Sequence, residues 1–144
     1  MKKRFMSLFL AVVMAFGMVS SGFAAAPVNE ILYGSATKLG EEITPYGTVE
    51  TYNIVVPADG SWVEVSEFRG EYQNGDRITV SSLWEPSYAS LALEFYADDG
   101  TATMGFMRSG EKNQFNLKSS SMWNLRVRAA EGTGAEGSLQ ITIS

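Results

Sequence analysis

The sequence contains neither cysteine nor histidine. Without cysteine there are no disulfides, no thiolate nucleophile, no cysteine-ligated metal and no lipidated cysteine of the bacterial lipoprotein kind. Without histidine there is no Ser-His-Asp or Cys-His catalytic group, and the usual zinc sites cannot form. These two absences exclude most hydrolase chemistry, and a pair of carboxylates is the main route to catalysis that remains.

The acidic residues do not provide such a pair in a favourable arrangement. Glu41 and Glu42 are neighbours, as are Asp98 and Asp99, but adjacent residues on a strand point to opposite faces. Asp98 and Asp99 also precede Gly100, which is common turn chemistry. We therefore predict that the protein is not an enzyme.

Calcium needs only oxygen ligands, so it is the metal that the composition leaves open. The acids available in loops are Asp76, Asp98, Asp99 and Glu131. Their spacing does not match a calcium-binding loop such as the EF-hand, which indicates solvated turn residues. We predict no metal and no cofactor, with loop-bound Ca²⁺ as the alternative.

Basic residues are few, and three of them stand at the start of the chain. Lys2, Lys3 and Arg4 precede an apolar run over residues 5–19, and small residues follow up to Ala24. This pattern is typical of a secretory signal peptide, and the apolar run is shorter than the ~20 residues of a membrane-spanning helix. We predict a leader over residues 1–24 and a secreted product, extracellular or, in a Gram-negative cell, periplasmic.

The chain beyond the leader is acidic. Three of the 11 basic residues lie in the leader and all 16 acids lie after it, which leaves eight bases against 16 acids and a net charge of −8. The remaining cations are scattered, so no basic patch is available to neutralise phosphates, and we predict no nucleic-acid partner. Binding to anionic membranes is disfavoured for the same reason.

Short alternating runs recur between turn signals after the leader, and sustained helical periodicity is absent. This spacing predicts an all-β fold, a single antiparallel β-sandwich of about eight strands. The expected strands are residues 49–56, 62–66, 76–82, 90–96, 101–107, 113–118, 123–129 and 138–143. Residues 25–144 are expected to form one domain, in which 49–144 build the sandwich and 25–48 add one or two short edge strands and a turn at Pro45.

Two patterns place Trp62 on different sides of its strand. The alternation over 62–66 puts Trp62 on the polar face. If the Asn74-Gly75 turn closes a hairpin, cross-strand counting puts Trp62 on the side of the apolar residues, with Phe68. Both patterns hold if a bulge near Gly70 switches the parity, and we favour this interpretation. In either case we expect the Trp62 ring to be shielded.

Several aromatic residues are candidates for ligand binding, because rings on rims and loops stack on sugars or hold protein chains. These candidates are Trp62, Trp84, Tyr88 and Tyr72. The expected ligand is a polysaccharide or an extracellular protein, and the alternative interpretation is that these rings cap the core. An alternative function is that of a structural or assembly protein that pairs through exposed strand edges.

The strand over 123–129 has one apolar and one polar face. Trp123, Leu125 and Val127 are expected inward, which leaves Arg126 and Arg128 outward. Two arginines on one face can clamp a carboxylate. In so acidic a chain, we expect them instead to pair with acids on neighbouring strands.

The stretch ETYNIVVPADG over 50–60 resembles a motif of the bacterial pre-peptidase C-terminal domains, which are small sandwiches attached to secreted peptidases. The stretches SLALEFYADDG over 90–100 and WNLRVRAAEGTGAEGSLQITIS over 123–144 are similar to later strands of that family. Ser90 and Ala92 stand where the family usually has acids, so the polar role of those acids is not carried over. The resemblance implies a jelly-roll-like sandwich with a non-catalytic, adhesive or accessory role.

Overall fold

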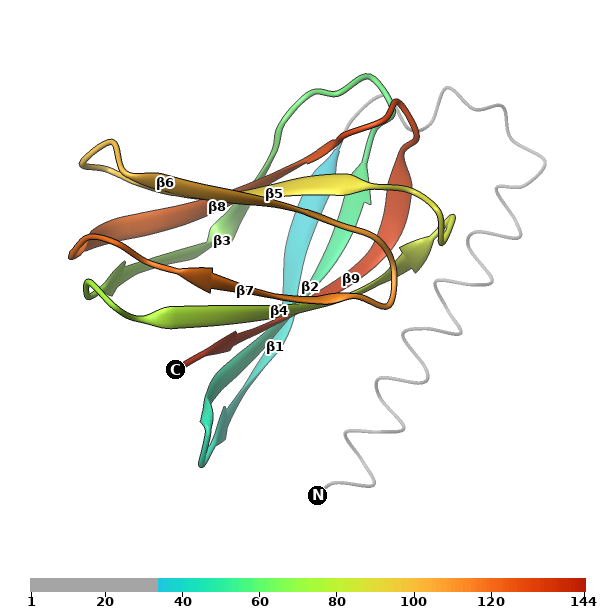
Figure 1. The fold of residues 1–144 in the computed structure, drawn as a ribbon. Coiled ribbons are helices and arrows are strands. Elements are labelled where there is room, and N and C mark those ends of the chain that lie inside the picture. Colours follow the sequence, from blue (N-terminus) through green and yellow to red (C-terminus); the bar gives the residue numbers. More distant parts are fainter. Residues whose placement is uncertain (1–33) are drawn as a thin grey trace. The chain divides into compact units, whose positions relative to one another are not determined.

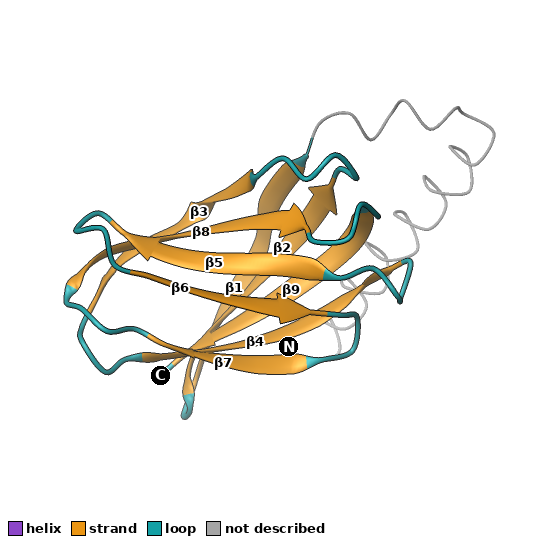
Figure 2. Cartoon of the chain, turned by 45° about the horizontal axis from the view of Figure 1, so that its top comes forward, coloured by secondary structure: helices purple, strands orange, loops and turns teal. Residues whose placement is uncertain are grey.

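The computed structural model describes residues 34–144, and all of its regular structure is β-strand (Figure 1). Turns and loops connect the strands, and no helix occurs within this range (Figure 2). These residues accordingly contain no helix that is long and apolar enough to cross a membrane. The leader predicted for residues 1–24 lies outside the described residues, as does its cleavage site.

Nine strands follow one another along the chain. They are β1 (Ser35–Thr44), β2 (Gly47–Val56), β3 (Val63–Tyr72), β4 (Arg77–Glu85), β5 (Leu91–Ala97), β6 (Ala102–Met107), β7 (Lys112–Asn116), β8 (Ser121–Ala129) and β9 (Ala135–Ile143). Sheet A contains β1, β2, β9, β4 and β7 in that order, and sheet B contains β3, β8, β5 and β6. All pairings in both sheets are antiparallel.

The strand order is that of a jelly roll. β2 pairs with β9, β3 with β8, β4 with β7 and β5 with β6, so the chain folds as a nested series of antiparallel pairs. Successive pairs alternate between sheet A and sheet B, as they do in the double Greek key of a jelly roll. The predicted antiparallel β-sandwich with jelly-roll topology is therefore confirmed.

β1 is a strand beyond the eight that the sequence predicted. One or two short edge strands were expected over 25–48, and the described part of this segment contains one edge strand of 10 residues. β1 joins β2 through a turn at Pro45 and Tyr46, so the predicted turn at Pro45 is confirmed.

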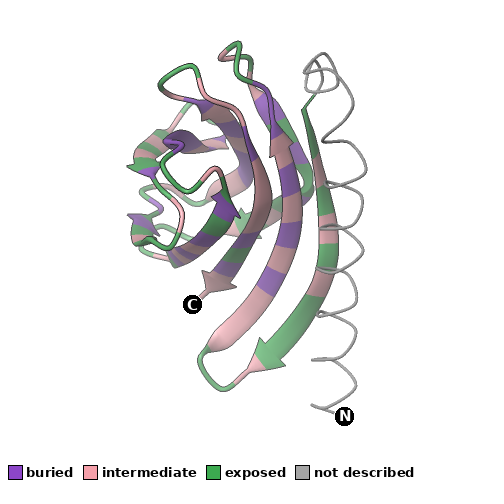
Figure 3. Ribbon diagram, turned by 90° about the vertical axis from the view of Figure 1, so that its right-hand side faces the viewer, coloured by how far each residue is buried: buried purple, intermediate pink, exposed green. Residues whose placement is uncertain are grey.

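Alternation along the strands produces the core. In β2, Tyr52, Ile54 and Val56 are fully buried while the residues between them are half-buried. The same banding of buried and less buried residues runs along the strands in Figure 3. The largest fully buried side chains are Trp84, Trp123, Tyr52, Phe68, Phe95, Ile54, Ile78, Leu91, Leu93, Met107, Leu117 and Leu125. The inward positions predicted for Trp123, Leu125 and Val127 are confirmed.

The Asn74-Gly75 turn does not close a hairpin, so the cross-strand count based on it is wrong. β3 pairs with β8, whereas β4 pairs with β7 and β9. The turn carries the chain from sheet B to sheet A, and the Gly75 amide donates to the carbonyl oxygen of Leu117 at 2.8 Å. Gly75 has the positive φ, 99°, that turn sequences of this kind favour, but this φ does not decide which strands pair.

The predicted change of parity in β3 does occur. The register of β3 against β8 shifts between Glu64 and Arg69. Val65 and Phe68 are both buried although they are three residues apart, so the irregularity lies between them and not near Gly70. A bulge here lets both halves of a 10-residue strand face the same core.

One carboxylate lies almost wholly inside the sandwich and ties β1 to β2. The Tyr52 hydroxyl donates to Glu50 Oε2 at 2.8 Å, and Lys38 Nζ of β1 donates to Glu50 Oε1 at 3.1 Å. Burial, followed by the hydrogen bond to Glu50, raises the pKa of Tyr52 far above its usual value. This network supplies the cation that a buried carboxylate needs.

We predict that Gly137→Ala destabilises the protein. Gly137 lies in β9 between β2 and β4, and a Cβ there would come within 2.1 Å of the Leu83 carbonyl oxygen and 2.4 Å of Trp84 Cα. The backbone would have to shift, and overpacking of this kind costs about 1–3 kcal/mol. The free energy of unfolding from urea titrations is the measurement.

Gly40→Ala is the matched control for this prediction. Gly40 lies on the edge strand β1, and a Cβ there would meet no atom within 4 Å. We expect its unfolding free energy to stay within about 0.5 kcal/mol of the parent. Equal stabilities of the Gly137 and Gly40 variants would contradict the close approach of β9 to β4.

Candidate functional site

The outer face of sheet B gathers aromatic and charged side chains in register. On β8, Arg126 lies opposite Glu64 of β3 and Glu94 of β5. Arg128 lies opposite Ala92 of β5. Because Val63 pairs with Val127, the residue before Val63, Trp62, is the neighbour of Arg128 on the β3 side. We call the resulting group the arginine–tryptophan cluster, and it consists of Trp62, Glu64, Glu94, Tyr96, Arg126 and Arg128.

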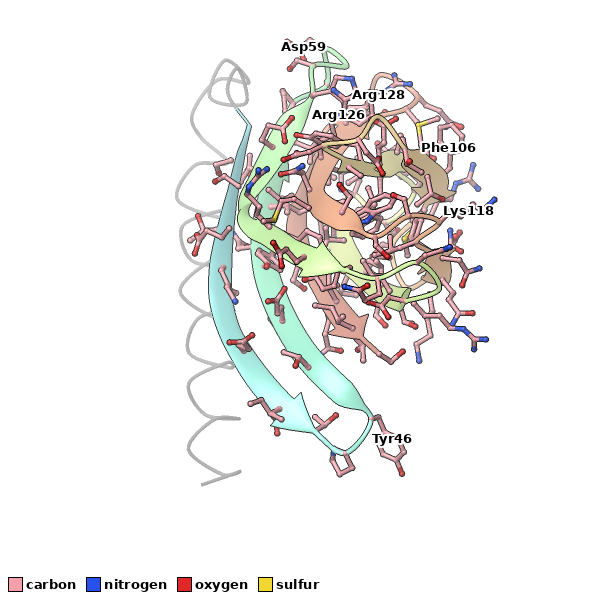
Figure 4. All side chains as sticks on the ribbon, turned by 90° about the vertical axis from the view of Figure 1, so that its left-hand side faces the viewer. Tyr46, Asp59, Phe106, Lys118, Arg126 and Arg128 are labelled. Carbon is pink, nitrogen blue, oxygen red and sulfur yellow. The ribbon has the colours of Figure 1, made fainter. Side chains whose placement is uncertain are left out.

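Trp62 is half-buried beneath two guanidinium groups. The Arg126 Cζ atom lies 4.2 Å from the centroid of the Trp62 ring, and the Arg128 Cζ atom lies 5.0 Å from it. Figure 4 labels both arginines at the same end of the sandwich. The alternation over 62–66 therefore placed Trp62 correctly on the polar face. The ring is shielded, as expected, but by cation–π contacts and not by the core.

An acid on the neighbouring strand β5 holds Arg126 in place. Its Nε donates to Glu94 Oε1 at 2.6 Å, and its guanidinium also lies 5.0 Å from the Tyr96 ring. The expected pairing with a neighbouring strand is thus confirmed for Arg126. Arg128 has no ion pair among residues 34–144, and its guanidinium contacts the neutral Trp62 ring, so its positive charge has no acidic partner there.

Tyr96 belongs to the same cluster, and the sequence did not single it out. Its hydroxyl donates to Glu64 Oε2 at 2.6 Å. Burial, and next the hydrogen bond to Glu64, raises the pKa of Tyr96 to about 12. Tyr96 therefore stays neutral at physiological pH and acts as a hydrogen-bond donor to the carboxylate.

A second polar network closes the far end of this face. Arg69 donates to Asn124 Oδ1 and, at 2.8 Å, to Asp98 Oδ2. Asn124 Nδ2 donates in turn to Asp98 Oδ1 at 3.1 Å and to the Tyr96 carbonyl oxygen at 3.2 Å. The hydrogen bond from Arg69, then that from Asn124, lowers the pKa of Asp98. These groups satisfy one another, so this network stabilises the bulged strand β3 on β8.

β6 adds exposed apolar surface to the outer face of sheet B, away from the Arg69–Asp98–Asn124 network. Met104 and Phe106 are 47% and 57% exposed, and they lie opposite Glu94 and Ala92 of β5. Sequence reasoning missed them, although the alternation over 101–107 separates them from the buried Met107. The alternation alone does not show which of the two faces of the strand is turned toward the core.

A shallow cavity adjoins Phe106 at the end of sheet B. Its lining residues are Ser90, Phe106, Met107, Arg108, Glu111, Ala130 and Glu131. Arg108 Nη2 lies 3.9 Å from Glu131 Oε1 in this cavity, which is a loose ion pair between exposed side chains. The cavity therefore extends the surface at Phe106 and offers charges of both signs.

The structure does not bring the four predicted aromatics together. Trp84 is only 2% exposed, and its Nε1 donates to the Ala89 carbonyl oxygen at 3.0 Å, so its prediction as an accessible ring is wrong. β4 continues to Glu85, and Trp84 keeps the inward parity of Ile78 and Val80. That parity was the signal in the sequence that could have placed it.

Tyr72 and Tyr88 also lie away from the cluster. Tyr72 is half-buried on the core side, where it stacks on Phe68 with ring centroids 5.9 Å apart. Burial is the main cause that raises the pKa of Tyr72 to about 12. Tyr88 is 70% exposed and lies in the connection between β4 and β5. Only Trp62 of the predicted set therefore lies on the outer face of sheet B.

The loop acids weighed as calcium ligands have other partners. Asp99 accepts from the Thr101 amide at 2.9 Å and Asp76 from the Gln73 amide at 2.8 Å, which are ordinary turn contacts. Within residues 34–144, no three acidic side chains gather in a way that would hold a metal ion.

No known protein-family model matches this chain, and no curated protein matches it by sequence. Among solved structures, it is similar to PliG of Aeromonas hydrophila, a periplasmic inhibitor of g-type lysozyme, with 13% identity over 76% of this chain and 86% of that chain and a TM-score of 0.42. It is also similar to a de novo designed double-stranded β-helix (14% identity, 67% of this chain and 97% of that chain, TM-score 0.38). A third is the Cnp3 cupin domain of Schizosaccharomyces pombe (10% identity, 76% and 60%, TM-score 0.36).

Similarities of this size carry no conclusion about ligand or activity. The resemblance to the pre-peptidase C-terminal domains stays a prediction.

We predict that Trp62→Ala costs much less stability than Trp84→Ala. Trp62 is half-buried and loses chiefly its contacts with Arg126 and Arg128, which we expect to be worth about 1–2 kcal/mol. Trp84 is buried, and its truncation leaves a cavity that costs about 3–5 kcal/mol. Chemical denaturation of both variants measures the difference. Similar losses in the two variants would show that Trp62 is a core residue.

We predict that stability falls in alkaline solution because two half-buried tyrosines ionise more readily in the unfolded chain than in the folded one. The pKa values of Tyr72 and Tyr96 are raised from 10.0 to about 12. The unfolded chain loses these protons first, so the stabilisation is complete below about pH 10 and is lost as the pH rises toward about 12. Urea midpoints measured between about pH 8 and 11 should fall. The fall should be smaller in Tyr96→Phe, and an unchanged midpoint in the parent at about pH 11 would contradict the raised pKa values.

Proposed function

We propose that the chain beyond its leader is a secreted, non-catalytic module that binds an extracellular protein through the outer face of sheet B. Polysaccharide is the alternative ligand for the same face. The single observation that supports the proposal is the arginine–tryptophan cluster with Met104 and Phe106 exposed beside it. Secretion rests on the leader motif of residues 1–24.

The composition of this face favours a protein partner. Tryptophan, tyrosine and arginine dominate the energetically important positions of protein interfaces, and phenylalanine and methionine are enriched there. Here the Trp62 and Tyr96 rings both contact Arg126, and Arg128 has no acidic partner among the described residues. An acidic group of a partner would form an ion pair with Arg128.

The same geometry disfavours a sugar on Trp62. A sugar stacks on the open face of an aromatic ring, and two guanidinium groups already lie within 4.2 and 5.0 Å of the ring centroid. A polysaccharide that stacks on the ring face covered by the guanidinium groups would have to displace the side chain of Arg126 or Arg128. Arg126 is also held by Glu94, which makes that displacement costly.

Assembly through strand edges, the alternative function, has less support. β1 packs beside β3 and β6 beside β7, so the edges of the two sheets approach each other. In addition, the Lys38 amide of β1 donates to Glu67 Oε1 at 3.0 Å, which occupies one donor of that edge. Edges covered in this way pair poorly with another chain.

Site-specific photo-crosslinking in the cells that make the protein tests the proposal. A benzophenone amino acid replaces Phe106 in one variant and Leu83 in a control, because both side chains are largely exposed and Leu83 lies on sheet A. We expect a discrete protein adduct from position 106 and none from position 83, and Arg128→Gln should reduce the adduct at least about tenfold.

Two results would contradict this prediction. Identical adducts from both positions would mean that the outer face of sheet B is not a binding site. Retention of the purified chain by cell-wall glycans, lost in Trp62→Ala while the melting temperature changes little, would make polysaccharide the ligand.

A further inference from the structure

The β1–β2 hairpin extends beyond the rest of the sandwich (Figures 1 and 3). Tyr46 marks its tip in Figure 4. Ile43 and Tyr46 are 86% and 85% exposed, which makes them the most exposed large apolar side chains among residues 34–144. Single exposed apolar side chains are common, but two at one projecting tip form an apolar patch, and exposed apolar patches mark interaction sites.

Ile43 lies at the end of a row of side chains that begins in the core. The register places Ile43 opposite Thr48 of β2, Thr48 opposite Ile143 of β9, and Ile143 opposite Ile78 of β4. Ile78 is fully buried, Ile143 is half-buried against the core, and Ile43 is 86% exposed. The core side of sheet A therefore continues past the edge of sheet B at this end, and Ile43 is left largely uncovered by the described residues although β1 packs beside β3 further along.

Hydrogen bonds across the turn hold the tip in one conformation. Thr44 pairs with Gly47 across the turn, the Thr44 hydroxyl donates to the Gly47 carbonyl oxygen at 2.8 Å, and the Tyr46 amide donates to Thr44 Oγ1 at 3.2 Å. Gly47 has a φ of 131°, which disfavours residues with a side chain. Further along the hairpin, the Lys38–Glu50 pair ties its two strands together. A preorganised surface loses little conformational entropy when it binds.

The charges around the tip are acidic. Glu41 and Glu42 lie next to Ile43 and are exposed, and Lys38, the nearest cation in sequence, is engaged by Glu50. Glu41 is 3.8 Å from Lys38, while Glu42 has no ion pair within the described part of the chain. The whole chain after the predicted leader, hairpin included, has 16 acids against eight bases.

We infer that the tip of the β1–β2 hairpin inserts into a cleft of a basic extracellular protein. A projecting apolar tip is buried most completely in a concave surface, and its acidic flanks match positive charge around that surface. A second copy of this chain is a poor occupant, because it brings the same acidic flanks and the same net negative charge. The hairpin is built from sheet A, so this surface is separate from the arginine–tryptophan cluster and goes beyond the function proposed above.

The test compares two double variants of the chain without its leader. Ile43→Thr with Tyr46→Ser removes the apolar tip. Leu83→Thr with Tyr88→Ser is the matched control, because these side chains are 66% and 70% exposed and lie outside the hairpin. All four positions are exposed, so both variants should melt like the parent.

The probes are a pancreatic-type ribonuclease and a c-type lysozyme, which are basic proteins with an open active-site cleft, and α-lactalbumin, an acidic protein of the lysozyme fold. Binding is measured by calorimetry at about 50 and 500 mM salt. We expect the parent to bind at least one basic probe, to bind it more weakly at high salt, and to ignore α-lactalbumin. The tip variant should bind at least about tenfold more weakly, whereas the Leu83/Tyr88 control should bind like the parent.

Several results would overturn the inference. If the parent binds neither basic probe, the inference is wrong. It is also wrong if the tip variant binds a basic probe as tightly as the parent does, or if the parent binds α-lactalbumin as tightly as a basic probe. If light scattering instead reveals a dimer that only the tip variant abolishes, the hairpin is a self-association surface. Loss of probe binding in Phe106→Ser, with the tip variant binding like the parent, would assign the binding to the outer face of sheet B.

Discussion

A row of aromatic rings through the interior joins the two sheets, and the placement of the outer-face residues depends on it. Tyr52 of sheet A contacts Phe68 of sheet B, Phe68 contacts Phe95, and Phe95 contacts Phe115 of sheet A, with centroid distances of 6.4, 5.4 and 4.9 Å. Phe68 reaches this row because the bulge in β3 changes the inward parity after Val65. Without the bulge the Phe68 ring would point outward, and contact between the sheets would be lost at this point.

The same demand for burial brings Trp62 and the arginines together. Because Val63 is buried at the start of β3, its neighbour Trp62 faces outward, and because Val127 is buried on β8, Arg126 and Arg128 face outward too. β3 and β8 are paired, so the ring and the guanidinium groups meet. The cation–π contacts thus follow from the way two adjacent strands bury their other faces.

The outer face of sheet B has a closed end and an open end. Arg69, Asp98 and Asn124 use their hydrogen-bonding groups on one another, and little of that capacity remains for a ligand. Arg128 and Phe106, by contrast, lie beside the small residue Ala92, close to the shallow cavity. Internal satisfaction at one end therefore leaves the other end as the part of this face that is able to bind.

The sequence by itself determined the class of fold and much of the local chemistry. A period of two is a property of each strand alone, so the inward residues of β2 and β8 were readable before any partner strand was known. The same period placed Trp62, Arg126 and Arg128 on polar faces. The lack of cysteine and histidine excluded whole classes of site for the same reason, because composition needs no structure.

Only the tertiary structure decided which strands are neighbours. Asn74-Gly75 has the sequence of a hairpin turn but connects two sheets, because turn chemistry constrains φ at one or two residues and not the partner of the next strand. Trp62 is shielded because β8, distant in the sequence, lies beside β3. Contacts of this kind join residues far apart in the chain, and no local period encodes them.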